Sequence, residues 1–299
     1  MSKHTESKKE KLIGLYESKR KQLFFIPIAI VLLALVLLGV SYVQTGEFIQ
    51  KDISISGGTI ITVETTNPNY TMQEVREHYA TEFDTIIQVS ELRNAGQLVG
   101  LILRTNIEST EVRDALVLDT IGYFQVSESA ISVEQTQSAF GQAFYASLIQ
   151  GVIIAFILMG VTIYIVFRRL VPSLLIISTI LTNMVVTLAV VSTFGLQLSS
   201  AGIAAFLMII GYAVDTNILL SWNVLKKLDV PMNQRIRIAA RTGLAMSATT
   251  IAALLVALFI TNSEVISQIL IILLVGLSFD LLNTWFFNAE LLRRFIGEN

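Results

Sequence analysis

The sequence predicts a polytopic α-helical membrane protein of six transmembrane helices, with one small α+β domain between the first and second helices. Three observations support this fold class. Of the 299 residues, 53% are hydrophobic and only 15% are charged, which is too apolar for a water-soluble globule. Six apolar runs reach the length of about 20 residues that a bilayer-spanning helix needs. Between the first two runs lies a polar segment with the alternating pattern of β-strands.

The formal net charge of −2 conceals a strong segregation of charge along the chain. The segment from Thr45 to Gly141 contains most of the acidic residues and few basic ones, while the other loops are basic. An acidic soluble domain is therefore inserted into a membrane protein. The chain has no cysteine, and its two histidines, His4 and His78, lie outside the apolar runs. Composition thus excludes disulfides and a histidine-based relay within the membrane, and we expect no metal and no cofactor.

The chain begins with a polar, basic segment over residues 1–21 and continues with the first predicted transmembrane helix over 22–43. This apolar run is longer than the core of a signal peptide, and no small-residue cleavage pattern follows it. We therefore expect a retained helix.

The extracytoplasmic domain is expected over residues 44–141. Its pattern predicts the order βαββαβ, which is typical of a ferredoxin-like unit. A capping box formed by Thr71 and Glu74 predicts the start of the first helix, and Ser109 is expected to cap the second. The elements are predicted, in order, at Thr59–Glu64, Thr71–Phe83, Thr85–Val89, Leu98–Arg104, Ser109–Ile121 and Phe124–Val133.

Residues 142–299 are predicted to form a five-helix membrane domain with a cytoplasmic carboxyl terminus. The segment before Arg241 is expected to be a separate amphipathic, interfacial one. Basic residues cluster at alternate loops, so the positive-inside rule places both termini in the cytoplasm and residues 44–141 outside. This makes the chain a multi-pass protein of the cytoplasmic membrane. The five helices are expected at 144–167, 171–193, 201–223, 242–261 and 265–288.

Two carboxylates fall inside these apolar runs. A carboxylate at the centre of a membrane helix costs at least about 2.5–3.5 kcal/mol, so Asp215 and Asp280 need a reason to be there. Asp215 is 14 residues past Ala201 and Asp280 is 15 past Val265. At about 1.5 Å per residue, both lie roughly 21–22 Å from the outer ends of their helices. We therefore expect the two acids at the same depth.

Small and polar residues surround these acids in the sequence. Gly211 and Gly276 each stand four residues before an acid, where a small residue allows close helix packing. Arg241 begins the fifth helix and could extend toward the acids. We expect an ion pathway here, although permanent packing contacts between helices are the alternative. The supporting polar residues are Asn183, Thr216, Asn217, Ser247, Thr249, Thr250 and Asn283.

Three ordered motifs resemble those of the SecD/SecF family. Ser54–Val63 (SISGGTIITV), with Gly57, Gly58 and Thr59, resembles the signature that opens the outer domain. Gly211–Asn217 (GYAVDTN) resembles the fourth-helix motif, and Arg241–Thr250 (RTGLAMSATT) resembles the fifth-helix motif. With six helices and one outer domain, the chain resembles the SecF branch of the family. The residues of its motifs resemble those of archaeal members. The resemblance covers nearly the whole chain.

The resemblance implies an accessory subunit of the Sec protein-export machinery that is built like half of an RND-type bundle. It implies a SecD partner, the Sec translocon channel and an unfolded, translocating polypeptide as contacts, within the lipid bilayer. It also implies coupling to the proton gradient, or to sodium in some relatives, through Asp215, and matches Arg241 to the arginine of the fifth-helix motif. No enzyme activity and no nucleic-acid partner are expected.

The chain departs from the family pattern at two places. Ser54 and Ile55 stand where the first motif usually has Asp-Phe, so no role of that acid carries over. Asp280 matches no acid that we associate with bacterial SecF, so its proposed coupling role depends on its depth alone.

Other functions are also considered. An intramembrane aspartyl protease would need Tyr-Asp and Gly-x-Gly-Asp motifs, which neither acid has. A small-solute exporter of the RND type is a closer alternative, but such chains typically carry two copies of this unit. A purely structural or binding subunit without coupling is the third alternative. Asn69 begins a glycosylation sequon in the outer domain, so modification there is possible.

Overall fold

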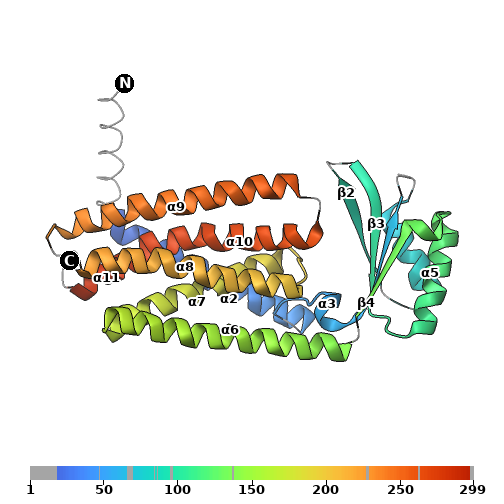
Figure 1. The fold of residues 1–299 in the computed structure, drawn as a ribbon, viewed down its shortest axis with the longest axis horizontal. Coiled ribbons are helices and arrows are strands. Elements are labelled where there is room, and N and C mark those ends of the chain that lie inside the picture. The colour runs from blue at the N-terminus through green and yellow to red at the C-terminus, as the bar shows by residue number, and fades with distance from the viewer. Residues whose placement is uncertain are drawn as a thin grey trace, which may run out of the picture.

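The computed structural model describes residues 19–46, 48–65, 70–83, 85, 87–94, 97–136, 138–226, 229–261 and 263–296. A bundle of long helices has a small sheet domain at one end (Figure 1). Within the described ranges, six helices are long and apolar enough to cross a membrane. The predicted fold class is therefore confirmed.

Four of the six long bundle helices are longer than the spans expected from the sequence, while the first and the last of the six are not. The π-helical segment η2, Asn283–Asn288, follows the last long helix and leads into the short helix α11, Ala289–Ile296. These two elements lie at the end of the bundle remote from the sheet, which we call the sheet-distal end (Figure 1). The six long helices are α2 Phe25–Thr45, α6 Ser138–Phe167, α7 Leu170–Thr193, α8 Ser200–Lys226, α9 Met232–Ile260 and α10 Glu264–Leu282.

The segment before Arg241 was expected to be separate from the fifth span, and this is wrong. α9 is one continuous helix from Met232 to Ile260. Its first turns are helical because Met232, Ile236 and Ala239 form a buried face at helical spacing. The helix is thus anchored at the sheet-distal end by packing within the protein.

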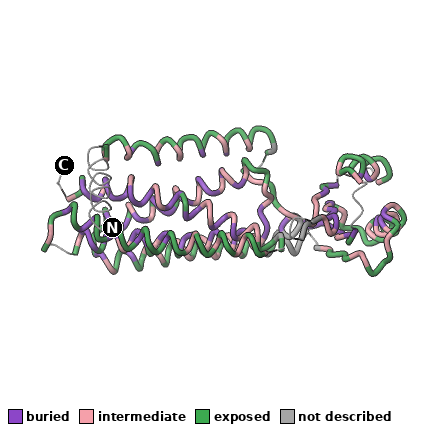
Figure 2. The backbone as a smooth tube through the Cα atoms, turned by 90° about the horizontal axis from the view of Figure 1, so that it is seen from above, coloured by how far each residue is buried: buried purple, intermediate pink, exposed green. Residues whose placement is uncertain are grey.

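The helices divide into an inner and an outer set. Within the apolar membrane-spanning stretch of each helix, 50% of the residues of α8 are buried, compared with 11% in α6 and in α9. Outer positions carry exposed apolar side chains such as Ile157, Leu158 and Phe259, as expected of surfaces in contact with lipid. Figure 2 shows exposed residues along the outer sides of the helices and buried ones toward the middle. α8 is therefore the central helix of the bundle.

The sheet domain has the predicted order of elements. Its four strands are antiparallel neighbours in the order β2-β3-β1-β4, with Ile61 of β1 opposite Leu103 of β3 and Val133 of β4. The ferredoxin-like assignment itself stays a prediction. The elements are α3 Ile53–Ser56, β1 Gly58–Glu64, α4 Met72–Phe83, β2 Gln88–Asn94, β3 Gln97–Thr105, α5 Thr110–Phe124, the 3-10 turn η1 Glu128–Ala130 and β4 Ile131–Thr136.

Two strands begin and end later than predicted, β2 and β4. The second strand begins at Gln88, later than expected, and the last begins at Ile131, since Phe124 still belongs to α5. The helix continues because Leu116, Thr120 and Phe124 form one buried stripe at helical spacing. It ends at Gln125, whose φ of 52° is left-handed and whose N–H donates to the Ile121 carbonyl.

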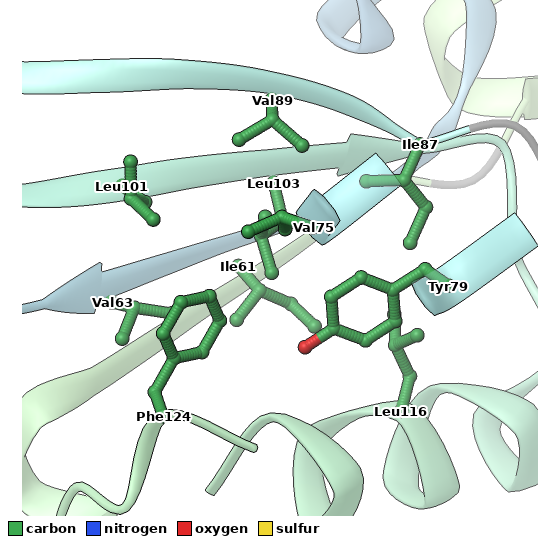
Figure 3. Packing of buried hydrophobic residues seen from close by; sticks show 10 residues of the cluster. All are labelled: Ile61, Val63, Val75, Tyr79, Ile87, Val89, Leu101, Leu103, Leu116 and Phe124. Carbon is green, nitrogen blue, oxygen red and sulfur yellow. The ribbon is translucent and has the colours of Figure 1, made fainter. Parts of the chain in front are cut away.

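The sheet and its two helices enclose a compact apolar core (Figure 3). Tyr79 is fully buried there, and its hydroxyl lies 2.9 Å from the Thr120 hydroxyl. Burial raises the pKa of the Tyr79 phenol above its ordinary value, so it remains a neutral hydrogen-bonding group. The predicted capping box is confirmed, because the Glu74 N–H donates to the Thr71 hydroxyl and the Thr71 N–H donates to the Glu74 carboxylate.

The sheet domain is connected to the loop between α7 and α8. Leu198 of this loop donates its N–H to the Gln50 carbonyl at 2.8 Å and accepts one from Asp52 at 3.0 Å. The Gln197 amide also hydrogen-bonds the side chain of Gln88 on β2. The loop that leads into the central helix is therefore in direct contact with the sheet domain.

Candidate functional site

α8 presents one exposed stripe along an otherwise buried helix. The stripe runs through Met208, Gly211, Tyr212, Asp215 and Trp222, at spacings of three, four and seven residues. Met208 and Tyr212 are each 39% exposed. Asp215 thus lies on the surface of the bundle, about midway along its central helix.

Asp280 has the opposite environment, with only 1% of its surface exposed. Its Oδ1 accepts a hydrogen bond from the Asn183 amide on α7 at 2.6 Å, and its Oδ2 accepts one from the Thr216 hydroxyl on α8 at 2.7 Å. The Thr284 hydroxyl donates to Oδ1 at 3.3 Å. Three inner elements therefore donate to one carboxylate, and no ion pair is made to it by any residue that the structure describes.

A second layer of polar groups orients the first. The Asn283 amide donates to the Asn183 Oδ1 at 2.8 Å, to the Thr182 hydroxyl at 2.7 Å and to the Thr179 carbonyl at 3.0 Å. Because the Oδ1 of Asn183 is held in this way, its amide nitrogen faces Asp280. Asn283 is therefore a positioning residue for this carboxylate.

The two acids do not form one cluster. Thr216 contacts Asp280, whereas its neighbour Asp215 is exposed, because successive helical residues point about 100° apart. Because Thr216, the residue after Asp215, contacts Asp280, the two acids lie at a similar depth, as expected. Asp215 lies on the exposed side of α8, while Asp280 is buried inside the bundle.

The residues expected on α9 do not join the Asp280 site. Arg241 is exposed, and among the described residues no ion pair connects it to either acid. Thr249 and Thr250 donate their hydroxyls to carbonyls of their own helix. Ser247 is buried on the face of α9 that packs against the bundle. α9 thus contributes packing, and Arg241 lies on its surface.

The glycines before the two acids have different roles. A Cβ atom on Gly276 would lie 2.5 Å from the Cδ1 of Ile209 and 3.2 Å from the Thr187 hydroxyl, so a glycine permits close contact of α10 with α8. A Cβ on Gly211 would meet nothing within 4 Å. The packing role expected of both glycines therefore applies to Gly276 alone.

The glycine motif of the sheet domain shapes the entry to β1. Gly57 and Gly58 have φ values of 85° and 134°, which favour glycine, and a Cβ on Gly58 would lie 2.3 Å from the Thr105 carbonyl oxygen. Thr59 donates its hydroxyl to the Ile107 carbonyl at 2.6 Å. These three residues fix the backbone where the sheet domain begins. Asn69, the possible glycosylation site, lies outside the described residues.

Sequence reasoning missed two members of the site, Thr284 and Asn288. Both follow Asp280 at intervals of four residues, a spacing that would have placed them on its face of the helix. Asn288 is fully buried and donates its amide to the Oδ1 of Asn217 at 2.5 Å. No cluster of metal-ligating side chains occurs within the part of the chain that the structure describes.

Comparisons with known proteins agree with this architecture. The family described as "Protein export membrane protein SecD/SecF, C-terminal" matches residues 119–298. The chain is 34% identical over 282 residues to the protein-export membrane protein SecF of Methanocaldococcus jannaschii, covering 91% of this chain and 94% of that one. It is 30% identical to the SecF of Pyrococcus furiosus, over 97% and 96% of the two chains.

Solved structures share the fold. The crystal structure of SecDF from Thermus thermophilus, a translocon-associated membrane protein, superposes with a TM-score of 0.74 at 18% identity. A second SecDF structure, in a super-membrane-facing form, gives a TM-score of 0.60 at 19% identity. The chain is covered to 94% and 92%, but spans only 38% of each SecDF chain. By its sequence over nearly its full length, the chain belongs to the SecD/SecF family of protein-export membrane proteins.

Proposed function

We propose that this chain is a SecF-type accessory subunit of the protein-export machinery, which works with a SecD-type partner to assist translocation of secreted proteins. The relatives at about 30% identity are named SecF, and they are matched over nearly their whole length. The SecDF chain with the same fold is more than twice as long. A separate SecD-type chain would supply the part that this chain does not contain.

The observation that carries the proposal is the exposed Asp215. A carboxylate facing hydrocarbon is costly, so intramembrane acids almost always face protein or a water-filled cavity. Gly211 leaves open space beside the exposed stripe of α8, one turn before this acid. A partner bundle seated on the stripe would cover Asp215 and remove it from lipid.

At this covered face, Asp215 would couple export to the ion gradient. Arg241 is exposed at the start of the membrane part of α9, which also packs against α8, and would supply a cation near the interface. Asp280 would serve as a second ion-binding group in the interior.

The proposal includes a membrane sidedness and a role for the outer domain. Both termini would be cytoplasmic, with the sheet domain outside, as the basic loops indicate. There the sheet domain would contact the translocating chain or the outer domain of the partner, near the translocon channel. Its contact with the α7–α8 loop through Leu198 supports transmission of movement to the central helix.

The test is Asp215→Asn in the full chain, assembled with its SecD-type partner. Protein export into membrane vesicles is measured with and without an ion gradient, with proton and sodium gradients dissipated separately. We expect the variant to assemble normally and to lose gradient-dependent stimulation. Met208→Leu, on the same stripe, is the control and should export like the parent. Unchanged stimulation in Asp215→Asn would instead support a subunit without coupling.

A further inference from the structure

A line of buried polar residues extends from Asp280 toward the sheet-distal end. On one side it consists of Asp280, Thr284 and Asn288, and on the facing side of α8 it consists of Asn217 and Ser221. Asn217, Ser221, Thr284 and Asn288 are all fully buried. The Asn288 amide connects the two sides by donating to the Oδ1 of Asn217, whose own amide donates to the Ala213 carbonyl of α8.

The π-helical segment keeps this line straight. In an α-helix of 3.6 residues per turn, each step of four residues drifts about 40° around the axis. A π turn contains more residues than an α turn, so it reverses that drift. η2 occupies Asn283–Asn288, beginning three residues after Asp280, and it thereby turns both Thr284 and Asn288 inward. Such π turns are frequent at functional sites.

The line carries oxygen atoms that lack protein donors. Within the described residues, the Ser221 hydroxyl and the Oδ1 of Asn288 are buried and have no hydrogen-bond partner. An unsatisfied buried polar atom costs about 1–3 kcal/mol, and bound water is the usual group that satisfies it. Ser221 lies one helical turn beyond Asn217 on the same face of α8, which brings the two acceptors to the same stretch of the interior. Buried apolar residues of one cluster, among them Val224 and Leu292, follow these residues on α8 and α11.

The donors around Asp280 suit both protonation states. The Thr216 hydroxyl lies 2.7 Å from the Oδ2 of Asp280 and 3.0 Å from the Ala213 carbonyl. It can donate to an ionised carboxylate or, after rotation, donate to the carbonyl and accept from a protonated one. No charged group faces Asp280 among the described residues: α7 contributes Asn183, α8 contributes Thr216 and η2 contributes Thr284. On the neighbouring helices α8 and α9, the charged groups Asp215, Lys226, Arg237 and Arg241 are exposed. The buried Arg235 of α9 donates to the Val230 and Val224 carbonyls, and in α11 the buried Arg293 and Glu290 contact Asn233 and Arg294.

We propose that Asn217, Ser221 and Asn288 hold buried water along the polar line that leads to Asp280, and that Asp280 exchanges a proton with water through this line. In the transfer, a hydronium ion gives its proton to the carboxylate and remains as neutral water, so charge and atoms balance. The site is separate from Asp215 on the surface. Its use in transport rests on the proposed function, but its existence does not.

The experiment is infrared difference spectroscopy of the full chain in lipid nanodiscs, recorded as a function of pH in H₂O and D₂O. We expect the carbonyl stretch of a buried, protonated carboxylic acid, which shifts in D₂O. Asp280→Asn should abolish this band, and Asp215→Asn should retain it. In Asn288→Leu the carboxyl proton should exchange for deuterium roughly tenfold more slowly, as expected when a hydrogen bond to the bridging water is lost. The D₂O shift of the band reports this exchange.

Ser221→Ala is the second variant, since it removes one acceptor with little change of volume and should also slow the exchange. Ser178→Ala, an exposed hydroxyl on α7, is the control and should exchange like the parent. A band that persists in Asp280→Asn, or exchange at the parental rate in both Asn288→Leu and Ser221→Ala, would overturn the proposal. Loss of export coupling at Asp215 does not affect this readout, so the two proposals fail independently.

Discussion

Asn183 and Asp280 lie 97 positions apart in the sequence, and the amide of the first donates to the carboxylate of the second at 2.6 Å inside the bundle. The contact connects α7 to α10, and the Thr216 hydroxyl connects α8 to the same carboxylate. One buried acid thus joins the three inner helices. The same side chain that we infer to bind a proton also holds the bundle together.

Replacing Asn183 with Leu should therefore destabilise the protein. The variant keeps most of the side-chain volume but removes a donor from Asp280 and an acceptor from Asn283. Losing one partner of a buried polar pair costs about 1–3 kcal/mol, and more when the remaining group is charged. The free energy of unfolding is measured on the purified chain in detergent, with Ser178→Ala as the control.

A double-mutant cycle decides whether this cost arises at Asp280. If the contact carries it, Asn183→Leu should cost much less in an Asp280→Leu background than in the parent. Equal costs in the two backgrounds would assign the effect to the Asn283 contact or to general packing.

The glycines that precede the two acids predict opposite outcomes for one substitution. In Gly276→Ala the new methyl group would meet Ile209 at 2.5 Å, and overpacking of a core costs about 1–3 kcal/mol. In Gly211→Ala the methyl group enters open space, and alanine is favoured over glycine in a helix by about 1 kcal/mol. Thermal unfolding of the two variants measures the difference. A loss of stability in Gly211→Ala, measured without a partner, would contradict this assignment.

The fold was predictable because its signals are local. Runs of about 20 apolar residues reveal membrane helices, and alternation between polar and apolar residues reveals strands such as β1. Boundaries were less predictable, since they depend on tertiary contacts. Phe124 belongs to a helix because it is buried beside Leu116, and Met232 begins α9 because it packs at the sheet-distal end.

The candidate site was predictable in its residues but not in its grouping. The cost of burying a charge identified both Asp215 and Asp280, and helical rise gave their common depth. Which way each side chain faces depends on the rotation of α8 against its neighbours, which one sequence does not specify. The π turn at Asn283–Asn288 was also not predictable, because no simple residue pattern distinguishes it from an α turn.

The capping box of α4 predicts a specific pH response in the sheet domain. The Thr71 hydroxyl and N–H hold the pKa of the Glu74 carboxyl below its ordinary value of 4.5. A depressed folded-state pKa means that the contribution of this carboxylate to stability is present above its unfolded-state pKa. It is lost as pH falls through the lower, folded-state pKa. The start of α4 should therefore loosen only in acid.

Carboxyl-labelled glutamate and NMR titration of the full chain in nanodiscs measure this shift, with the Glu74 signal assigned by its loss in Glu74→Gln. Thr71→Ala removes the hydroxyl that interacts with Glu74, so the titration midpoint should rise toward the ordinary value. Thr81→Ala is the matched control, because its hydroxyl donates to the Glu77 carbonyl in the same helix. A midpoint that rises equally in Thr81→Ala would show that general loosening of α4, rather than the cap, sets the pKa of Glu74.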